Sequence, residues 1–142
     1  MRFMMLMIPG GYEKAAPGTV PDAKGVEAMM KYNEQLQKAG VLLELDGLHP
    51  PSEGARVTFA AGTPTVIDGP YIETKEVLGG YWMIDVPSKV EAVAWAKRCP
   101  AGPTEVIEIR QVFEMEEFPD DVQQAAAKFP EMQRRASRRK GR

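Results

Sequence analysis

The sequence predicts an α+β fold over residues 1–113, followed by a C-terminal extension over residues 114–142. Three observations support this prediction. Short apolar runs bounded by glycine or proline are typical of strands, and two longer segments carry helix signals in their spacing or their caps. Each half of the chain then follows the order strand, helix, strand, with a hairpin between the halves. This order predicts a ferredoxin-like split βαβ sandwich with an inserted β-hairpin.

The first half opens with a strand and a helix. Residues 2–8, RFMMLMI, form a continuous apolar run closed by Pro9, as expected for a central strand buried on both faces. Asp22 can cap a helix over residues 23–40, which Gly40 ends. The apolar positions of this helix, at a spacing near 3.6, are Val26, Met29, Met30 and Leu36.

Strands and a hairpin follow this helix. Residues 41–48 predict a second strand. Residues 55–59 and 64–67 flank the short loop Ala60-Ala61-Gly62-Thr63, so we expect them to pair as a hairpin. Residues 79–86 predict the strand that begins the second half.

The second half repeats the pattern and ends in a further helix. Ser88 and Glu91 form a capping box that opens a helix. Residues 104–112 predict the last strand, and residues 120–137 predict a terminal helix interrupted near Pro130. In such a fold the helices cover one face of the sheet. The other face keeps its apolar side chains uncovered, so we expect a homodimer packed sheet on sheet.

Composition limits the class of protein. Apolar residues make up 44% of the chain, but no run approaches the roughly 20 residues of a membrane helix, so no membrane association is expected. The N-terminal apolar run lacks a small-residue cleavage site and is better used as a strand than as a signal peptide. The single Cys99 excludes an internal disulfide, and with these features it predicts a cytoplasmic protein.

Charge is concentrated at the C-terminus. Residues 134–142, RRASRRKGR, carry six basic residues and no acid, while the other 133 residues hold 12 basic and 20 acidic ones. Such a segment can bind nucleic acid or an anionic surface. No aromatic residue interleaves the arginines, so we favour a solvated terminus and expect no nucleic-acid partner.

The segment IDGPYIETKEVLGGYWMIDV, residues 67–86, resembles the DGPF proteins of the YCII-related family. It contains Asp-Gly-Pro, an acid-Thr-Lys-Glu run and a Gly-Gly step, with Tyr71 where the family motif has phenylalanine. Residues 32–50 and 91–112 resemble that family in order and spacing as well.

The resemblance implies a dimeric α/β barrel, a fold whose members include monooxygenases, isomerases and a dehydrochlorinase-like enzyme. It also implies a His-Asp acid-base pair, in which the aspartate maps to Asp68 and the histidine lies on the first helix. The predicted first helix has no histidine here. The only histidine of the chain is His49, which follows the second strand.

Asp68 and His49 are the candidate catalytic residues. Aspartate before Gly-Pro is a good turn former, so a structural role competes with that of a general base whose pKa is raised by burial. His49 is suited to proton transfer near neutral pH, or it is a surface residue beside two prolines that hold the backbone extended.

A dense polar stretch follows Asp68. It is either an exposed loop with local charge pairs, or a binding surface in which Lys75 and Arg56 attract an anionic substrate while a carboxylate takes a proton. Tyr81 and Trp82 point to opposite faces of their strand, one toward the core and the other toward a pocket or partner. The candidate substrate-binding residues are Arg56, Tyr71, Glu73, Lys75, Glu76 and Tyr81.

No cofactor or metal is predicted. A zinc site is not expected because the chain has one histidine and no cysteine pair. A divalent site built from Asp68, Glu73 and Glu76 stays open. Cys99, at the end of a helix, is expected to be a core thiol.

Two functions compete. The first is a small-molecule enzyme acting by Asp68-centred proton transfer in a pocket of the homodimer, as an isomerase, lyase or dehydrochlorinase-like catalyst. The second is a non-catalytic module that binds a small ligand or a protein. The resemblance to DGPF proteins adds a possible link to alternative sigma factors for this second function.

Overall fold

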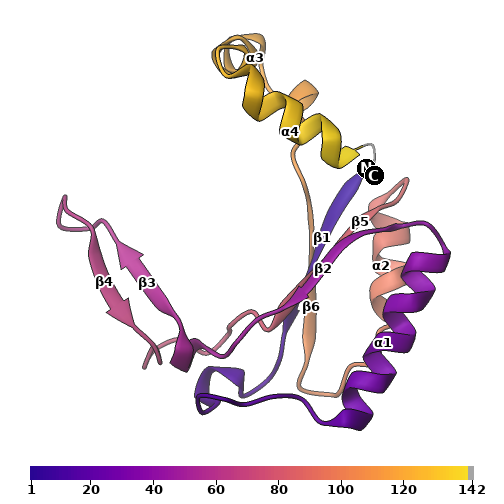
Figure 1. The fold of residues 1–142 in the computed structure, drawn as a ribbon, viewed down its shortest axis with the longest axis vertical. Helices are drawn as coiled ribbons and strands as arrows, with labels where there is room; N and C mark the ends of the chain where they lie inside the picture. Colours follow the sequence, from indigo (N-terminus) through magenta and orange to yellow (C-terminus); the bar gives the residue numbers. More distant parts are fainter. Residues whose placement is uncertain (141–142) are drawn as a thin grey trace.

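The structure, a computed structural model, describes residues 1–140; residues 141 and 142 of the basic C-terminal segment lie outside the described residues. Four strands form one antiparallel sheet in the order β2-β5-β1-β6, which confirms the predicted α+β class. Helices α1 and α2 lie together on one face of this sheet (Figure 1). The bounds are β1 Arg2–Ile8, α1 Ala23–Lys38, β2 Leu42–Gly47, β5 Gly80–Asp85, α2 Lys89–Lys97 and β6 Val106–Gln111.

Both helices begin where their capping residues predict. The Asp22 carboxylate accepts a hydrogen bond from the Gly25 backbone N–H at 2.6 Å, which satisfies one of the free amides of the first turn. The Ser88 hydroxyl oxygen accepts from the Glu91 N–H at 3.3 Å. Gly40 follows α1 with a φ of 72°, a left-handed conformation that glycine adopts without strain.

Strand β1 is central, but the prediction that it is buried on both faces is wrong. Phe3, Met5 and Met7 are at most 7% exposed because they face the two helices. The alternate residues Met4 and Leu6 are only half-buried, since no helix covers their side of the sheet. A continuous apolar run thus has one face in the core and an uncovered apolar second face.

The buried residues of α1 are not all at the apolar positions that the sequence predicted to face the core. Val26 and Met30 are exposed, whereas Tyr32 and Leu36 are buried. The Tyr32 ring packs edge-on against Trp82 with centroids 5.7 Å apart, and its hydroxyl donates to the Trp95 carbonyl oxygen at 2.8 Å. Burial raises the pKa of Tyr32 far above its usual range. Tyr32 therefore belongs to the core.

Cys99 is half-buried and packs against the same core. Burial, with a smaller contribution from Glu105, raises the pKa of its thiol to about 11. The thiol is therefore neutral near pH 7, as expected for a core cysteine.

The uncovered face of the sheet carries two rows of side chains that run across all four strands. Both rows have an apolar centre and polar ends. One row, set by the strand register, is Glu44, Met83, Met4 and Arg110. The next is Asp46, Tyr81, Leu6 and Glu108. Tyr81 thus lies on this face and Trp82 in the core, as predicted.

The hairpin forms a second sheet of its own. Strands β3 (Ala55–Thr58) and β4 (Thr65–Asp68) pair only with each other and project away from the body on the side opposite α1 and α2 (Figure 1). Four apolar side chains of this arm are between 46% and 69% exposed. They are Val57, Phe59, Val66 and Ile67.

The C-terminal extension consists of the short turn η3 (Met115–Glu117), α3 (Asp120–Ala127) and α4 (Pro130–Lys140). The predicted break near Pro130 is confirmed, and α4 takes in most of the basic segment. These two helices lie beyond the end of the sheet rather than against α1 or α2 (Figure 1). Among residues 1–140, the structure contains no helix with the length and hydropathy needed to span a membrane.

Candidate functional site

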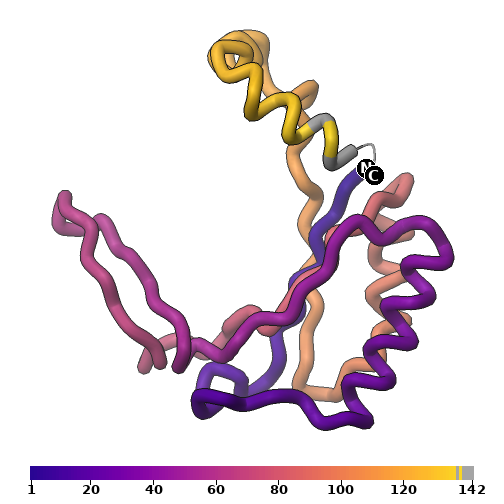
Figure 2. Tube along the Cα trace, viewed as in Figure 1, coloured from indigo at the N-terminus to yellow at the C-terminus, as the bar shows by residue number. Residues whose placement is uncertain are grey.

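Three loops meet at the end of the sheet from which the hairpin projects (Figure 2). We call this region the loop junction: residues 12–19 with the turn η1 (Tyr12–Lys14), residues 48–54 with the turn η2 (Pro51–Glu53), and residues 68–75. Contacts between η1 and η2, and between Gly69 and Pro51, hold the loops together. Most of the predicted site residues lie here.

The Asp-Gly-Pro step fixes the base of the hairpin. The Gly69 N–H donates to the Gly54 carbonyl oxygen at 2.9 Å. A Cβ atom on Gly69 would lie 1.6 Å from the Pro51 carbonyl oxygen, so only glycine fits this close backbone approach. The glycine of the motif therefore has a structural role.

The Gly-Gly step docks the start of β5 in the same way. The Gly79 N–H donates to the Met7 carbonyl oxygen at 2.8 Å, and its carbonyl oxygen accepts from the Leu48 N–H at 2.9 Å. A Cβ atom on Gly79 would lie 2.5 Å from Pro9 Cγ. These contacts join the ends of β1 and β2 to the returning chain.

His49 contacts Glu53. Its Nδ1 lies 3.2 Å from Glu53 Oε2, and its side chain is 82% exposed. The same oxygen of Glu53 accepts from the Gly18 N–H at 3.2 Å. The Gly18 hydrogen bond, followed by the His49 contact, lowers the pKa of Glu53. Glu53 is thus a charged residue that orients the imidazole and anchors the loop that carries Gly18.

Tyr12 and Ser52 add two further hydrogen bonds across the junction. The Tyr12 hydroxyl donates to the Leu48 carbonyl oxygen, and the Ser52 hydroxyl donates to the Ala15 carbonyl oxygen at 2.8 Å. Burial, and then the charge of Glu53, raises the pKa of Tyr12. The phenol is therefore neutral and serves as a donor.

Arg56 organises the loop after Asp68. Its guanidinium lies 3.9 Å from the centroid of the Tyr71 ring, and its Nη1 donates to the Thr74 hydroxyl at 2.8 Å. The Thr74 N–H in turn donates to the Tyr71 carbonyl oxygen at 3.2 Å, which closes a turn. Arg56 therefore stabilises this turn through its contacts with the Tyr71 ring and the Thr74 hydroxyl.

This turn forms one wall of a cavity of about 520 Å³, which we call the junction cavity. Residues of η1 also line it. The lining residues are Glu13, Lys14, Pro70, Tyr71, Ile72, Thr74 and Lys75. The volume is in the range of small-molecule sites.

A family model for the YCII-related domain matches residues 1–116. The chain belongs to the YCII-related family. It is also similar to an uncharacterized protein of Rhizobium meliloti (strain 1021), with 40% identity over 60 residues. That match covers 42% of this chain and 48% of the relative, so the chain spans about half the length of the relative that it matches.

In this YCII-related protein the predicted binding residues are divided between two places. Tyr71 and Lys75 line the junction cavity, and Arg56 packs on the ring of Tyr71. Tyr81 lies on the uncovered sheet face, where its hydroxyl donates to Asp46 at 2.9 Å. The hydrogen bond to Asp46 raises the pKa of Tyr81. Tyr81 is therefore separate from the cavity-lining group.

The predicted acidic residues are all exposed. Asp68 ends β4 opposite Ala55, and Glu73 and Glu76 lie in the loop that follows. Within residues 1–140, no group of three or more histidine, cysteine or acidic side chains is placed to hold a metal ion. The divalent site from Asp68, Glu73 and Glu76 is thus not assembled in the described part of the chain.

Sequence reasoning missed Tyr12, Glu13, Lys14 and Glu53. The first three lie in a segment that reads only as a loop, and they reach the site through contacts with residues far along the chain. The spacing of Glu53, four residues after His49, could have indicated a contact between the two side chains. The prolines between them were expected to keep the chain extended, but Pro51 begins the turn η2, which brings the two side chains together.

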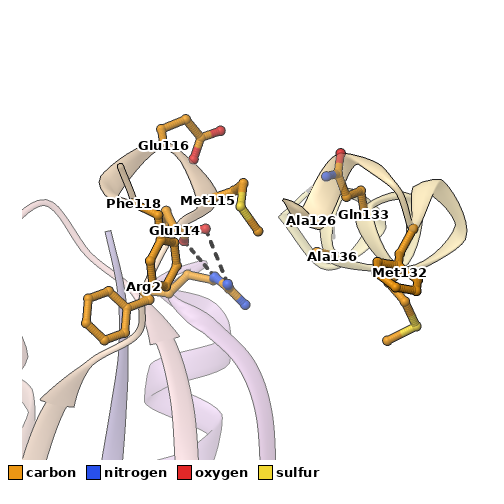
Figure 3. Close-up of a pocket in the computed structure, with 11 residues that line it drawn as sticks. Arg2, Glu114, Met115, Glu116, Phe118, Ala126, Met132, Gln133 and Ala136 are labelled. Atoms are coloured by element: carbon orange, nitrogen blue, oxygen red, sulfur yellow. Dashed lines mark hydrogen bonds and ion pairs between the residues drawn. The ribbon is translucent and has the colours of Figure 1, made fainter. Parts of the chain in front are cut away.

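The YCII-related protein has a second cavity, of about 440 Å³, in the extension. Figure 3 shows Arg2, Met115 and Phe118 on one side of it and Met132 and Ala126 on the other. Glu114 closes its base by accepting hydrogen bonds from the Arg2 guanidinium at 2.8 and 3.3 Å.

Proposed function

We propose that this YCII-related protein is a homodimeric small-molecule enzyme that performs acid-base chemistry at the loop junction, as an isomerase, lyase or dehydrochlorinase-like catalyst. The observation that carries this proposal is the contact of 3.2 Å between His49 and Glu53. A carboxylate at Nδ1 favours the neutral tautomer with its proton on Nδ1, which leaves Nε2 as a base.

The contact also supports the reverse step. After Nε2 has taken a proton from one position of the substrate, the ring held by Glu53 can return it to another. Asp68, exposed at the end of β4, is the second candidate for proton transfer in this proposal. The 82% exposure of His49 leaves its ring accessible to a substrate.

A second protomer is part of the proposal because two surfaces lack cover in a single chain. Met4, Leu6 and Met83 form an apolar stripe on the uncovered sheet face. An isolated two-stranded hairpin is marginally stable in water, yet β3 and β4 expose apolar side chains on the same side of the molecule. Packing two copies face to face buries both surfaces.

The charges on the uncovered face favour one orientation of the two copies. If the twofold axis runs parallel to the strands, β2 of one protomer faces β6 of its partner, and Glu44 faces Arg110, which lies in the same row. If the axis runs across the strands, β2 faces itself and four carboxylates from Glu44 and Asp46 come together. The first arrangement also brings Asp46 opposite Glu108, but each edge then holds one arginine among three carboxylates, so it avoids the cluster of four carboxylates found in the second.

The strand order supports the finer fold assignment within this proposal. In β2-β5-β1-β6, each helix connects an inner strand to an outer strand two positions away in the sheet, as in the ferredoxin-like plan. Two such sheets packed through their uncovered faces would make the dimeric α/β barrel. The hairpin is an insertion between the two βαβ halves.

Proton transfer can be tested without knowing the reaction. The protein is incubated in deuterium oxide with a panel of keto acids and hydroxy acids, and proton NMR follows exchange of carbon-bound protons. We expect exchange of at least one compound above the buffer rate, lost in His49→Asn and reduced in Asp68→Asn. No exchange across the panel, or exchange that persists unchanged in His49→Asn, would remove the acid-base proposal.

A non-catalytic binding module is the second candidate. It is favoured by the exposed apolar arm, because such a surface also suits a protein partner. A monodisperse monomer that tolerates polar substitutions at Val66 and Phe59 without a change in stability, and that exchanges no protons, would favour this module.

A further inference from the structure

We propose that the junction cavity binds a small monoanionic carboxylate that also carries a hydroxyl or amino group. This inference rests on the function proposed for the loop junction and names the class of its ligand. It follows from three features of the cavity wall: two lysines without ion pairs, one buried carboxylate oxygen without a donor, and an aromatic ring held in place by Arg56.

The two lysines supply the anion-binding part. Lys14 comes from η1 and Lys75 from the loop after Tyr71, and both line the cavity. Neither forms an ion pair within residues 1–140, in contrast to Lys31 and Lys38 on α1, which pair with glutamates four residues earlier. A carboxylate between two such cations gains charge-assisted hydrogen bonds.

Glu13 is the reason that the ligand must carry a hydrogen-bond donor. Its Oε2 atom is buried and has no hydrogen-bond donor among the described residues. A buried carboxylate oxygen without a donor is costly, and native proteins rarely leave one unsatisfied. Because Glu13 lines the same cavity as the lysines, a ligand hydroxyl or amino group can satisfy this oxygen while the ligand carboxylate contacts the lysines.

The balance of charge selects a monoanion. The lining carries two positive charges and one negative charge, so one additional negative charge neutralises it. A dianion such as sulfate would place excess negative charge beside Glu13 and has no proton to donate to its carboxylate oxygen. Pro70 and the Tyr71 ring provide apolar surface for the body of the ligand.

Arg56 is a positioning residue in this site. Its guanidinium lies on the Tyr71 ring and donates one hydrogen bond to the Thr74 hydroxyl, and Arg56 is not among the residues that line the cavity, so it positions the wall instead of taking the anion itself.

The test uses matched pairs of acids and proton-nitrogen correlation NMR on the full chain. Propionate is compared with lactate, and benzoate with 3- and 4-hydroxybenzoate and 4-aminobenzoate; sulfate is the dianion control. We expect at least one hydroxy or amino acid to shift the amide signals of residues 71–75 and to bind about tenfold more tightly than its parent acid.

Variants assign the two contacts. The double variant Lys14→Met/Lys75→Met should weaken the parent and the substituted acid by about tenfold or more, whereas Lys89→Met on α2 should change neither. Glu13→Ala should remove the difference between the two acids; Glu13→Gln, which keeps the shape of the side chain, repeats this test if Glu13→Ala does not fold.

Three results would overturn the inference: no acid shifts the residue 71–75 signals, parent and substituted acids bind equally, or sulfate binds most tightly. If binding fails but His49-dependent proton exchange is found, only the ligand class is wrong. If binding holds without proton exchange, the cavity is a binding site and the acid-base proposal is wrong.

Discussion

Asn33 accepts a hydrogen bond from the indole N–H of Trp82 at 2.8 Å, and both side chains are buried. The bond joins α1 to β5 at the centre of the core. Asn33 is the one buried polar residue of the described core, and its amide oxygen satisfies a donor that would otherwise have no access to water.

Asn33→Leu should destabilise the protein by about 1–3 kcal/mol, because it leaves the Trp82 N–H buried without an acceptor. Trp82→Phe in the Asn33→Leu background should cost less than Trp82→Phe alone, since the unsatisfied donor is then absent. Urea unfolding of the four proteins completes the double-mutant cycle. Strictly additive effects would contradict the assigned hydrogen bond.

Gly69→Ala should destabilise the loop junction by about 1–3 kcal/mol or more, because its Cβ would lie 1.6 Å from the Pro51 carbonyl oxygen. Gly47→Ala is the matched control: a Cβ there meets no atom within 4 Å, and the residue does not have a positive φ. The measurement is thermal unfolding of both variants. Equal, small shifts would show that the backbone contact at Gly69 is not needed.

Charge reversal tests the orientation of the proposed dimer. Glu44→Arg and Arg110→Glu should each weaken association by about tenfold or more, and the double variant should restore it. Analytical ultracentrifugation across a concentration series measures the dissociation constants. If Glu44→Arg strengthens association instead, β2 faces β2 of the partner and the twofold axis runs across the strands.

The pH dependence of stability follows from Glu53. Its pKa is lowered from the usual 4.5, so folding favours the charged form. This contribution is complete above the pKa of the unfolded chain and is lost as the pH falls through the lower pKa of the folded state. Wild type should therefore be more stable than Glu53→Gln near pH 7, and the difference should shrink as the pH falls through that acidic range.

Unfolding curves recorded between neutral and acidic pH provide the measurement. Glu76→Gln, in an exposed loop position, is the control and should track wild type at every pH. A Glu53→Gln deficit that is the same at all pH values would indicate lost packing instead of lost charge.

Local signals predicted most of the elements. The run of residues 2–8 matches β1 from end to end, and Asp22 and Ser88 begin their helices as capping rules require. Whether a face of the sheet is covered, in contrast, does not follow from the local sequence. Whether Met4 and Leu6 are buried depends on where the helices pack, so the periodicity of β1 alone could not show that one face is uncovered.

The site was predicted less completely because it is assembled from distant segments. Lys75 and Arg56 were expected to attract an anionic substrate, a role that stays a prediction; Lys75 and Tyr71 line the junction cavity, and Arg56 packs on the Tyr71 ring. Glu13 and Lys14 reach this cavity across more than 50 residues of chain, through loop contacts that no sequence period records. Whether Asp68 and the other candidates act on a substrate stays a prediction.

Strands β3 and β4 share no ladder hydrogen bond with the four-stranded sheet. The register of the core strands is therefore independent of the length and composition of the arm. Changing the length of this insertion is therefore expected to leave the fold of the body unchanged, as long as Gly69 keeps its close approach to Pro51 at the base of the arm.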